Sequence, residues 1–180
     1  MSHSNSNASQ LLLANLALFE NLKPVHGVLD LACGYGRNGL FLSRHNVSVQ
    51  FADNNEAALQ SISSELEQTD LNGECWLVDF EETGISPLQG KLFDAVVVFN
   101  YLHRPLFDSI KQAIRPGGLI AYETFTIDQK EFGRPSNPDF LLHSNELKKV
   151  FSGWEILQEF EGEAVDPQRA IASIIARRPE

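Results

Sequence analysis

A glycine-rich loop that follows a short apolar run is the segment of this sequence best suited to hold a nucleotide-like ligand. The apolar run covers residues 28–32, and Gly34, Gly36 and Gly39 after it fit the pattern G-x-G-x-x-G. Glycines at such a turn let the protein backbone approach a ligand closely. In a dinucleotide site the pyrophosphate lies at the N-terminus of the following helix, so a dinucleotide is the first ligand to consider.

The carboxylate of Asp30, within the apolar run just before the glycines, argues against a dinucleotide. It would place negative charge beside the pyrophosphate, where the helix N-terminus favours anions. The same carboxylate suits S-adenosylmethionine, which has no phosphate but carries a cationic amino group and a sulfonium. Asp30 therefore favours the sulfonium cofactor, with capping of the following turn as the alternative. We expect the neighbouring Cys33 to be a small packed residue rather than a nucleophile.

Further polar residues follow the next three expected strands. Asp53 can accept both ribose hydroxyls of either cofactor class. Asp79 is placed to accept from an adenine amino group while the ring of Phe80 packs on the purine. Asn100 lies at the carboxyl edge, where such sheets bind ligands. The expected cofactor-binding residues are Asp30, Ala32, Gly34, Gly36, Asn38, Asp53, Asn54, Asp79, Phe80 and Asn100.

Residues after the fourth expected strand and at the end of the fifth are candidates for the acceptor side of the site. His103 acts either as a general base or as a helix cap that orients Arg104. Arg104 binds an anionic acceptor or forms an ion pair within the protein. Glu123 faces the substrate or pairs with an arginine. We take these three as candidate catalytic residues, and Tyr101 and Arg134 as candidate substrate-binding residues.

A long irregular stretch, residues 125–143, contains one glycine and two prolines. Loops of this length inside a compact domain are uncommon and often functional. It is expected to be either a lid that excludes water from the site or a rigid surface loop. Basic residues expected at the same sheet edge hint at an anionic acceptor; they are His103, Arg104, Arg134 and His143.

Apolar periodicity predicts alternating strands and helices around these sites. A turn is expected at residues 115–118, and Ser144 is expected to cap a helix. The alternation implies one doubly wound α/β domain over residues 1–180, with residues 1–24 as a helical extension. Its mostly parallel seven-stranded sheet has helices on both faces and a C-terminal antiparallel hairpin. The expected helices cover residues 9–21, 38–44, 55–69, 106–114 and 145–151, and the strands cover 28–32, 47–52, 75–78, 93–99, 119–124, 154–160 and 169–176.

The composition limits the partners of this protein. Its formal net charge is -10 and no run of basic residues exceeds two, so no nucleic acid is expected to bind. Cys33 and Cys75 lack metal-ligand spacing, so no metal site is expected. The apolar stretch 11–19 is too short to span a bilayer, and residues 1–10 show no signal-peptide pattern. We expect a cytoplasmic monomer or homodimer that does not contact membranes and acts on a small molecule.

The segment 28–38 resembles the first motif of class I S-adenosylmethionine-dependent methyltransferases. Its continuation into the following helix resembles the tellurite-resistance methyltransferase subgroup in particular. Asp53, Asp79 and the turn at 115–118 match later landmarks of the same superfamily. The resemblance covers residues 25–124 and implies a class I methyltransferase fold.

The activity implied by this resemblance is methyl transfer from S-adenosylmethionine, with S-adenosylhomocysteine as product. The expected acceptor is small, such as a metalloid oxyanion, a thiol or another small metabolite. A soft acceptor needs no general base, whereas an oxygen or nitrogen acceptor that loses a proton benefits from one. The alternatives are a protein or RNA methyltransferase, an NAD-type oxidoreductase, and a non-catalytic S-adenosylmethionine-binding regulatory module.

Overall fold

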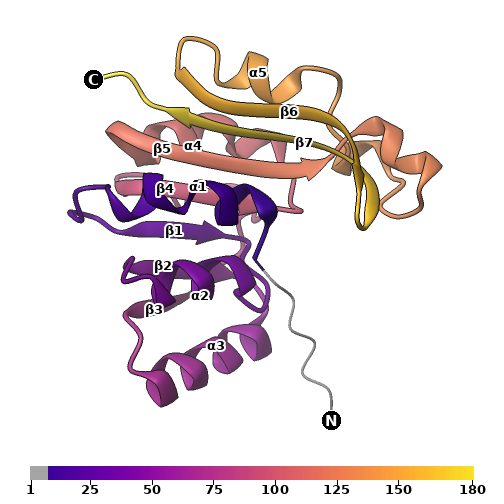
Figure 1. Cartoon of the computed structure of the whole chain (residues 1–180). Helices are drawn as coiled ribbons and strands as arrows, with labels where there is room; N and C mark the ends of the chain where they lie inside the picture. Colours follow the sequence, from indigo (N-terminus) through magenta and orange to yellow (C-terminus); the bar gives the residue numbers. More distant parts are fainter. Residues whose placement is uncertain (1–7) are drawn as a thin grey trace.

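Seven strands form a single sheet in the order β3-β2-β1-β4-β5-β7-β6 (Figure 1). The computed structural model describes residues 8–180, so residues 1–7 of the expected N-terminal extension lie outside the described residues. Strands β1 to β5 pair in parallel, whereas β7 is antiparallel to both β5 and β6. This arrangement confirms the predicted sheet and its C-terminal hairpin. The strands are β1 (Val28–Leu31), β2 (Val49–Asp53), β3 (Gly73–Leu77), β4 (Phe93–Phe99), β5 (Ile114–Phe125), β6 (Glu155–Val165) and β7 (Gln168–Arg177).

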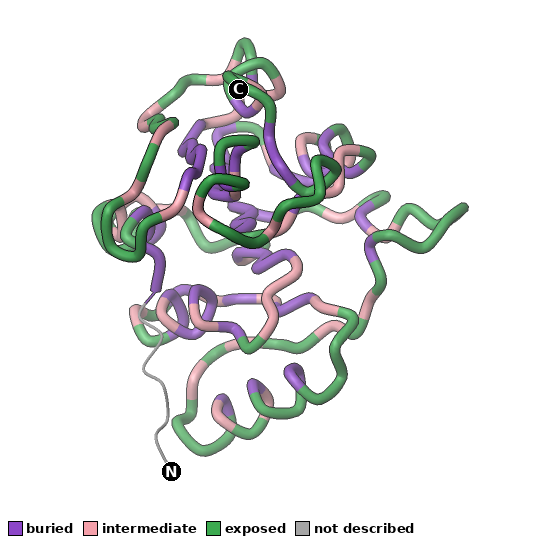
Figure 2. Tube along the Cα trace, turned by 90° about the vertical axis from the view of Figure 1, so that its right-hand side faces the viewer, coloured by how far each residue is buried: buried purple, intermediate pink, exposed green. Residues whose placement is uncertain are grey.

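Helices cover both faces of the sheet, as predicted. Apolar side chains of α1, α2 and α3 pack in one core, and those of α4 and α5 pack in the other. Strand β4 lies between the two cores and is buried along its whole length. Figure 2 shows exposed residues on the outer turns of the helices and in the connecting loops. The helices are α1 (Gln10–Glu20), α2 (Arg37–Arg44), α3 (Glu56–Thr69), α4 (Phe107–Ala113) and α5 (Glu146–Val150), with short 3-10 helices η1 (Arg104–Leu106), η2 (Ile127–Glu131) and η3 (Pro138–Phe140).

The segment 115–118 is an irregularity inside β5, not the predicted turn between a helix and a strand. The register of β5 against β4 shifts between the pairs Phe93↔Ile114 and Ala95↔Leu119. Gly117 has a φ of 70°, and its N–H donates to the carbonyl of Arg178 at 3.0 Å, so the segment stays within the sheet. Glycine and proline in a sequence do not distinguish a turn from a β-bulge, because turns and bulges require the same unusual backbone angles.

Two smaller predictions near the C-terminus are also wrong. Ser144 does not cap α5; its hydroxyl donates to Glu161, and the residue before the helix is Asn145 in a left-handed conformation. The strand predicted over residues 154–160 is too short, because β6 runs on through Gly162 to Val165 and the turn consists only of residues 166 and 167. Strands β6 and β7 stay paired beyond Gly162, although a glycine at this place in the sequence is typical of a turn.

The parallel strands β1, β2, β3 and β4 all end at the same edge of the sheet. Polar residues that follow these strands therefore come together, although they are far apart in the sequence. Within residues 8–180, no helix has the length and apolar character needed to cross a membrane.

Candidate functional site

A cavity of about 320 Å³ opens at the carboxyl ends of β1 to β4, and we call it the strand-end cavity. Six of the residues predicted for cofactor binding line this cavity, together with Tyr101 from the predicted substrate set. Glu81 also lines it, and it is a residue that the sequence does not single out. The full lining is Ala32, Asp53, Asn54, Val78, Asp79, Phe80, Glu81, Asn100 and Tyr101.

The carboxylate of Asp53 ties the glycine loop to the end of β2. Its Oδ2 accepts the N–H of Gly34 at 2.7 Å, and its Oδ1 accepts the N–H of Asn55 at 2.9 Å. Because each carboxylate oxygen has a second lone pair, both oxygens can still accept a hydroxyl group of a ligand. Asp53 is thus held in position for the ribose-binding role predicted for it.

The three glycines of the loop serve different physical purposes. A Cβ on Gly36 would lie 2.8 Å from Ile62 Cδ1, and one on Gly39 would lie 2.4 Å from Phe51 Cε1. Those two glycines therefore allow close packing between elements of the fold. A Cβ on Gly34 would meet nothing within 4 Å, although its φ of +53° favours glycine. Gly34 is the loop glycine that leaves open space for a ligand.

Asp30 lies behind the glycine loop and not in the wall of the strand-end cavity. It is 2% exposed, and its Oδ2 accepts the N–H of Gly39 at 2.8 Å, so it holds the start of α2 against β1. Burial raises the pKa of Asp30 to about 7, although the Gly39 hydrogen bond and the charge of Arg37 act in the opposite direction. A cation bound near the loop would favour the ionised form.

Cys33, beside the glycine loop, is not set up as a nucleophile. Burial, together with the nearby charges of Asp30 and Asp53, raises the pKa of the Cys33 thiol far above neutral. The thiol therefore stays protonated at neutral pH, as expected for a packed residue.

Asn38 and Glu123 take part in a buried polar cluster at the start of α1. Asn38 Oδ1 accepts the N–H of Ser9 at 2.8 Å, and Glu123 Oε1 accepts the Ser9 hydroxyl at 3.1 Å. Glu123 Oε1 is also 3.4 Å from Nη2 of Arg169. Glu123 thus has the arginine partner that the sequence left open as an alternative. Neither Asn38 nor Glu123 lines the strand-end cavity.

A second cavity, of about 180 Å³, adjoins the first, and we call it the lid cavity. Pro135 and Phe140 of the predicted lid segment line it, so this segment does lie against a cavity at the sheet edge. The lining is Glu81, Asn100, Tyr101, Leu102, Thr124, Phe125, Pro135 and Phe140. Three of these residues, Glu81, Asn100 and Tyr101, also line the strand-end cavity.

Thr124 and Glu123 are neighbours in β5 but have different surroundings. Thr124 lines the lid cavity, and its hydroxyl is buried without a hydrogen-bond partner in the structure. Glu123 bonds to Ser9 of the α1 region instead. The side chains of successive strand residues point to opposite faces of the sheet, so Glu123 and Thr124 cannot both face the lid cavity. The sequence marks both as strand-end residues but does not say which face holds the cavity.

Glu81 joins the two cavities and interacts with Tyr101. Burial, together with the nearby charge of Glu81, raises the pKa of Tyr101. The phenol is therefore neutral near pH 7 and acts as a donor. The only feature of the sequence that could have indicated Glu81 is its position two residues after Asp79. In the structure the N–H of Glu81 donates to Asp79 Oδ1 at 2.9 Å.

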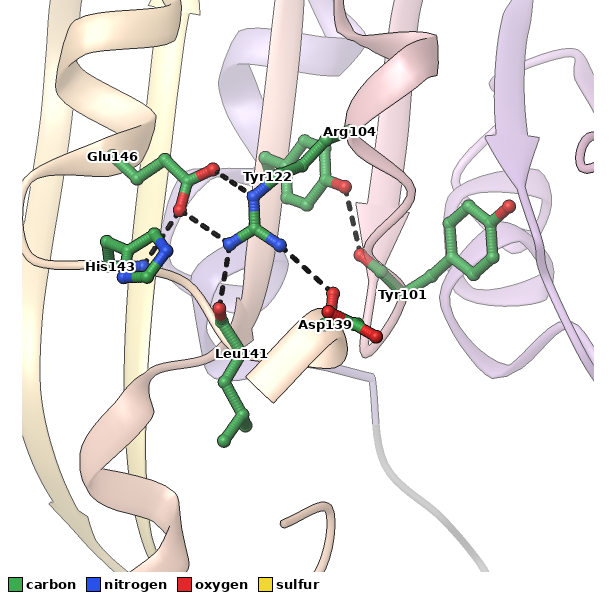
Figure 3. A network of polar contacts seen from close by, with 7 residues as sticks. All are labelled: Tyr101, Arg104, Tyr122, Asp139, Leu141, His143 and Glu146. Atoms are coloured by element: carbon green, nitrogen blue, oxygen red, sulfur yellow. Dashed lines mark hydrogen bonds and ion pairs between the residues drawn. The ribbon is translucent and has the colours of Figure 1, made fainter. Parts of the chain in front are cut away.

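Arg104 is the centre of a polar network that holds the lid segment (Figure 3). Its Nε and Nη2 donate to the two carboxylate oxygens of Glu146 at 2.7 and 2.9 Å. Its Nη1 and Nη2 also donate to the carbonyls of Asp139 and Leu141 at 3.0 and 2.8 Å. Figure 3 shows the ring of Tyr101 pointing away from this network. The geometry thus favours the ion-pair alternative for Arg104.

The other basic candidates lie outside both cavity linings. His103 is the residue before η1 and forms no side-chain cap there. Arg134 and His143 are exposed, and the backbone N–H of His143 donates to Glu146. No arginine, lysine or histidine is among the residues that line either cavity, whereas Asp53, Asp79 and Glu81 are.

The sheet order and the cavity at the ends of its parallel strands define the class I methyltransferase fold. The crystal structure of TehB from Haemophilus influenzae is similar to it with a TM-score of 0.69 and 26% identity, covering 84% of this chain and 57% of that chain. N-methyltransferase NodS from Bradyrhizobium japonicum WM9 shares the fold with a TM-score of 0.68 and 17% identity, over 95% and 93% of the two chains.

The family model for tellurite resistance protein TehB matches residues 13–166. A relative from Haemophilus influenzae (strain ATCC 51907 / DSM 11121 / KW20 / Rd), described as a probable S-adenosyl-L-methionine-dependent methyltransferase TehB, is 31% identical over 136 residues. That match covers 73% of this chain and 46% of the relative, so the chain spans about half the length of this curated relative. The chain belongs to the TehB family.

Proposed function

We propose that this protein binds S-adenosylmethionine in the strand-end cavity and transfers its methyl group to a small acceptor. The observation that carries the proposal is the meeting of strand-end residues from β1 to β4 in one cavity that contains carboxylates and no basic residue. A cationic cofactor without phosphate is complementary to such a lining, whereas a pyrophosphate is not. The TehB relatives described as probable S-adenosyl-L-methionine-dependent methyltransferases support the same assignment.

The residues present fit this cofactor. Asp53 would accept from the ribose hydroxyls, and Asp79 would accept from the adenine amino group beside the ring of Phe80. The open space at Gly34 would admit the part of the ligand that lies against the loop. Bound S-adenosylmethionine supplies an electrophilic methyl group on sulfur, and the main contribution of the protein is to hold donor and acceptor close and aligned.

The acceptor is proposed to be a small molecule because the space beside the strand-end cavity is only about 180 Å³. Neither Arg104 nor Arg134 lines this space. We therefore do not propose that the acceptor is an anion, although the sequence positions of these two arginines suggest one. The acceptor approaches from the side of Tyr101 and Asn100, which line both cavities.

Calorimetric titration with S-adenosylmethionine, S-adenosylhomocysteine and NAD in parallel tests the cofactor assignment. We expect binding of the first two and none of NAD. Asp53→Asn should weaken binding of S-adenosylmethionine by about tenfold, because a charged hydrogen-bond acceptor contributes about 1.5 kcal/mol. The matched control is Asp108→Asn on the exposed face of α4, which should change nothing. Binding of NAD alone would reject the proposal.

A further inference from the structure

We propose that Gln129 is a positioning residue that holds the lid segment, residues 125–143, as a fixed wall of the lid cavity, and that this wall selects methyl acceptors by size. This inference rests on the proposed methyl transfer and deepens it, because it names a residue that sets which acceptors fit. Three sets of contacts carry it: the bonds of Gln129 itself, the bonds that join the two ends of the lid segment, and the bonds that hold its far side.

The side-chain amide of Gln129 connects the lid segment to strand β7. The residue lies in η2 and is 4% exposed. Its Oε1 accepts the N–H of Ala170 at 2.8 Å, and its Nε2 donates to the carbonyl of Arg134 at 3.1 Å. One partner is a donor and the other an acceptor, so the two partners determine the orientation of the amide. The carbonyl that Nε2 holds directly precedes Pro135, which lines the lid cavity.

The main chain of Gln129 holds the turn that brings Arg134 back towards it. The carbonyl of Gln129 accepts the N–H groups of Phe132 and Gly133 at 2.9 and 3.1 Å. Gly133 has a φ of 129°, a backbone conformation that favours glycine. The main chain and the side chain of one buried residue therefore fix both the turn and the residue that follows it.

The two ends of the lid segment are bonded to each other and to β7. The N–H of Leu142 donates to the carbonyl of Phe125, and the N–H of Ile127 donates to the carbonyl of Leu142, both at 2.9 Å. The N–H of Thr126 donates to the carbonyl of Ala170 at 3.1 Å, so both backbone polar groups of Ala170 bond to this segment. Figure 1 shows the segment beside the hairpin of β6 and β7. The base of the lid segment is therefore fixed to the sheet.

The far side of the lid segment is held by a different side chain. Arg104 donates to the carbonyls of Asp139 and Leu141, on either side of Phe140 (Figure 3). Phe140 and Pro135 both line the lid cavity. Each of these two residues thus follows a carbonyl that a side chain holds in place. Gln129 positions one part of the wall, and the arginine positions the other.

A wall held in this way limits the size of the acceptor. The lid cavity has a volume of about 180 Å³, and a cavity of about 150 Å³ is large enough for benzene. A molecule with two fused rings needs more room, so it enters only when Pro135 moves outwards. A wall that is in place before the acceptor arrives also lowers the entropy lost on binding. Gln129 therefore both strengthens the binding of acceptors that fit and excludes larger ones.

Two variants separate the bonds of the Gln129 side chain. Gln129→Met removes both bonds and keeps a long unbranched side chain. Gln129→Glu keeps an acceptor for the N–H of Ala170 but places a carboxylate oxygen against the carbonyl of Arg134, where no bond can form. The matched control is Gln158→Glu on β6, because the oxygen of Gln158 accepts from Asn15 and the residue lies outside both cavity linings.

Hydrogen exchange tests whether Gln129 holds the lid segment. It is measured with S-adenosylhomocysteine present, so that the donor side of the site is occupied. In Gln129→Met, the amides of Phe132, Gly133 and Ala170 should exchange about tenfold faster than in the wild type, which is the effect of losing about one hydrogen bond. In Gln129→Glu, only the first two amides should exchange faster. The Gln158→Glu control should exchange at the wild-type rate at all three.

Two neutral thiols of different size test the selection of acceptors. Phenylmethanethiol has one ring and 2-naphthylmethanethiol has two fused rings, and their Kd values are measured by ligand-observed NMR with S-adenosylhomocysteine present. The wild type should bind the single-ring thiol at least about tenfold more tightly. Both Gln129 variants should bind the single-ring thiol about tenfold more weakly and should lose most of the preference for it. Their affinity for S-adenosylhomocysteine should equal that of the wild type.

Three outcomes would overturn this inference: unchanged exchange at Phe132 and Gly133 in Gln129→Met, an unchanged ratio of the two thiol affinities in both Gln129 variants, or no preference for the single-ring thiol in the wild type. If Gln129→Met does not fold, Gln129→Glu, which keeps the bond to Ala170, supplies the same two measurements. Absence of S-adenosylhomocysteine binding to the wild type would instead reject the proposed function, so the two failures are distinguishable.

Discussion

The guanidinium of Arg104 forms a two-point ion pair with the carboxylate of Glu146, with Nε 2.7 Å from Oε1 and Nη2 2.9 Å from Oε2. The same guanidinium bonds to the carbonyls of Asp139 and Leu141, on either side of Phe140. Phe140 lines the lid cavity. A residue that sequence position suggests for anion binding therefore fixes the backbone of the lid segment.

Arg104→Lys distinguishes these two roles. Lysine keeps the positive charge but cannot form the forked pair and both carbonyl bonds, so about 1–3 kcal/mol of stability should be lost locally. We expect faster hydrogen exchange at the amides of residues 138–142 and weaker acceptor binding. Calorimetry with S-adenosylhomocysteine serves as the control and should give unchanged affinity. Unchanged hydrogen exchange and unchanged acceptor binding would show that the positive charge of Arg104, and not its bonds to the lid segment, is required at this position.

Alanine substitutions at two loop glycines should have different effects. Gly39→Ala places a Cβ 2.4 Å from Phe51 and 2.7 Å from Asp30, so unfolding free energy should fall by about 1–3 kcal/mol. Gly34→Ala meets no neighbour and should cost about 1 kcal/mol through its left-handed backbone, while cofactor affinity falls. Chemical denaturation and titration with S-adenosylmethionine measure the two effects. Equal stability losses would contradict the packing role of Gly39.

Asp30 is expected to make cofactor binding pH-dependent. Its pKa of about 7 means that the ionised form becomes dominant as the pH rises through neutrality. Affinity for the sulfonium cofactor should therefore rise between about pH 6 and pH 8, because only the ionised carboxylate attracts a cation. Titration at three pH values should show this trend in the wild type and not in Asp30→Asn. S-adenosylhomocysteine, which lacks the sulfonium charge, should show a weaker trend.

The stability contribution of Asp30 should change in the opposite direction. The folded-state pKa is raised above the ordinary value of 3.8, so the folded protein binds the proton more tightly than the unfolded chain does. The contribution of Asp30 to the free energy of unfolding is fully present below pH 3.8 and is lost as the pH rises through about 7. Denaturation of the wild type and of Asp30→Asn between about pH 5 and pH 8 should show the variant gaining about 1–3 kcal/mol relative to wild type. A constant difference would mean that Asp30 is not protonated in the folded state.

Glu123→Gln tests whether Glu123 is part of the chemistry. Its carboxylate bonds to Ser9 and pairs with Arg169, and it lines neither cavity. We expect turnover within about threefold of wild type, together with a stability loss of about 1–3 kcal/mol from the weakened buried pair. A hundredfold loss of turnover in a folded variant would restore Glu123 as a catalytic residue.

The sequence by itself determines the α/β class, the parallel sheet and most of the polar residues that meet in the strand-end cavity. Asp53, Asp79 and Asn100 are predictable because the residues that follow parallel strands must meet at one edge of the sheet. The periodicity of the segments around them determines which parts of the chain become strands. These are local patterns with a fixed geometric consequence, so no knowledge of packing is needed.

Only the tertiary structure decides the roles of the remaining residues. Gly36 and Gly39 look equivalent to Gly34 in the sequence, but their neighbours Ile62 and Phe51 come from other elements of the fold. Likewise Arg104 meets Glu146, 42 positions away, which no local pattern indicates. The choice between adjacent strand residues, such as Glu123 and Thr124, depends on which sheet face each helix covers. Side-chain roles of this kind follow from contacts between distant segments, and those contacts exist only once the chain has packed.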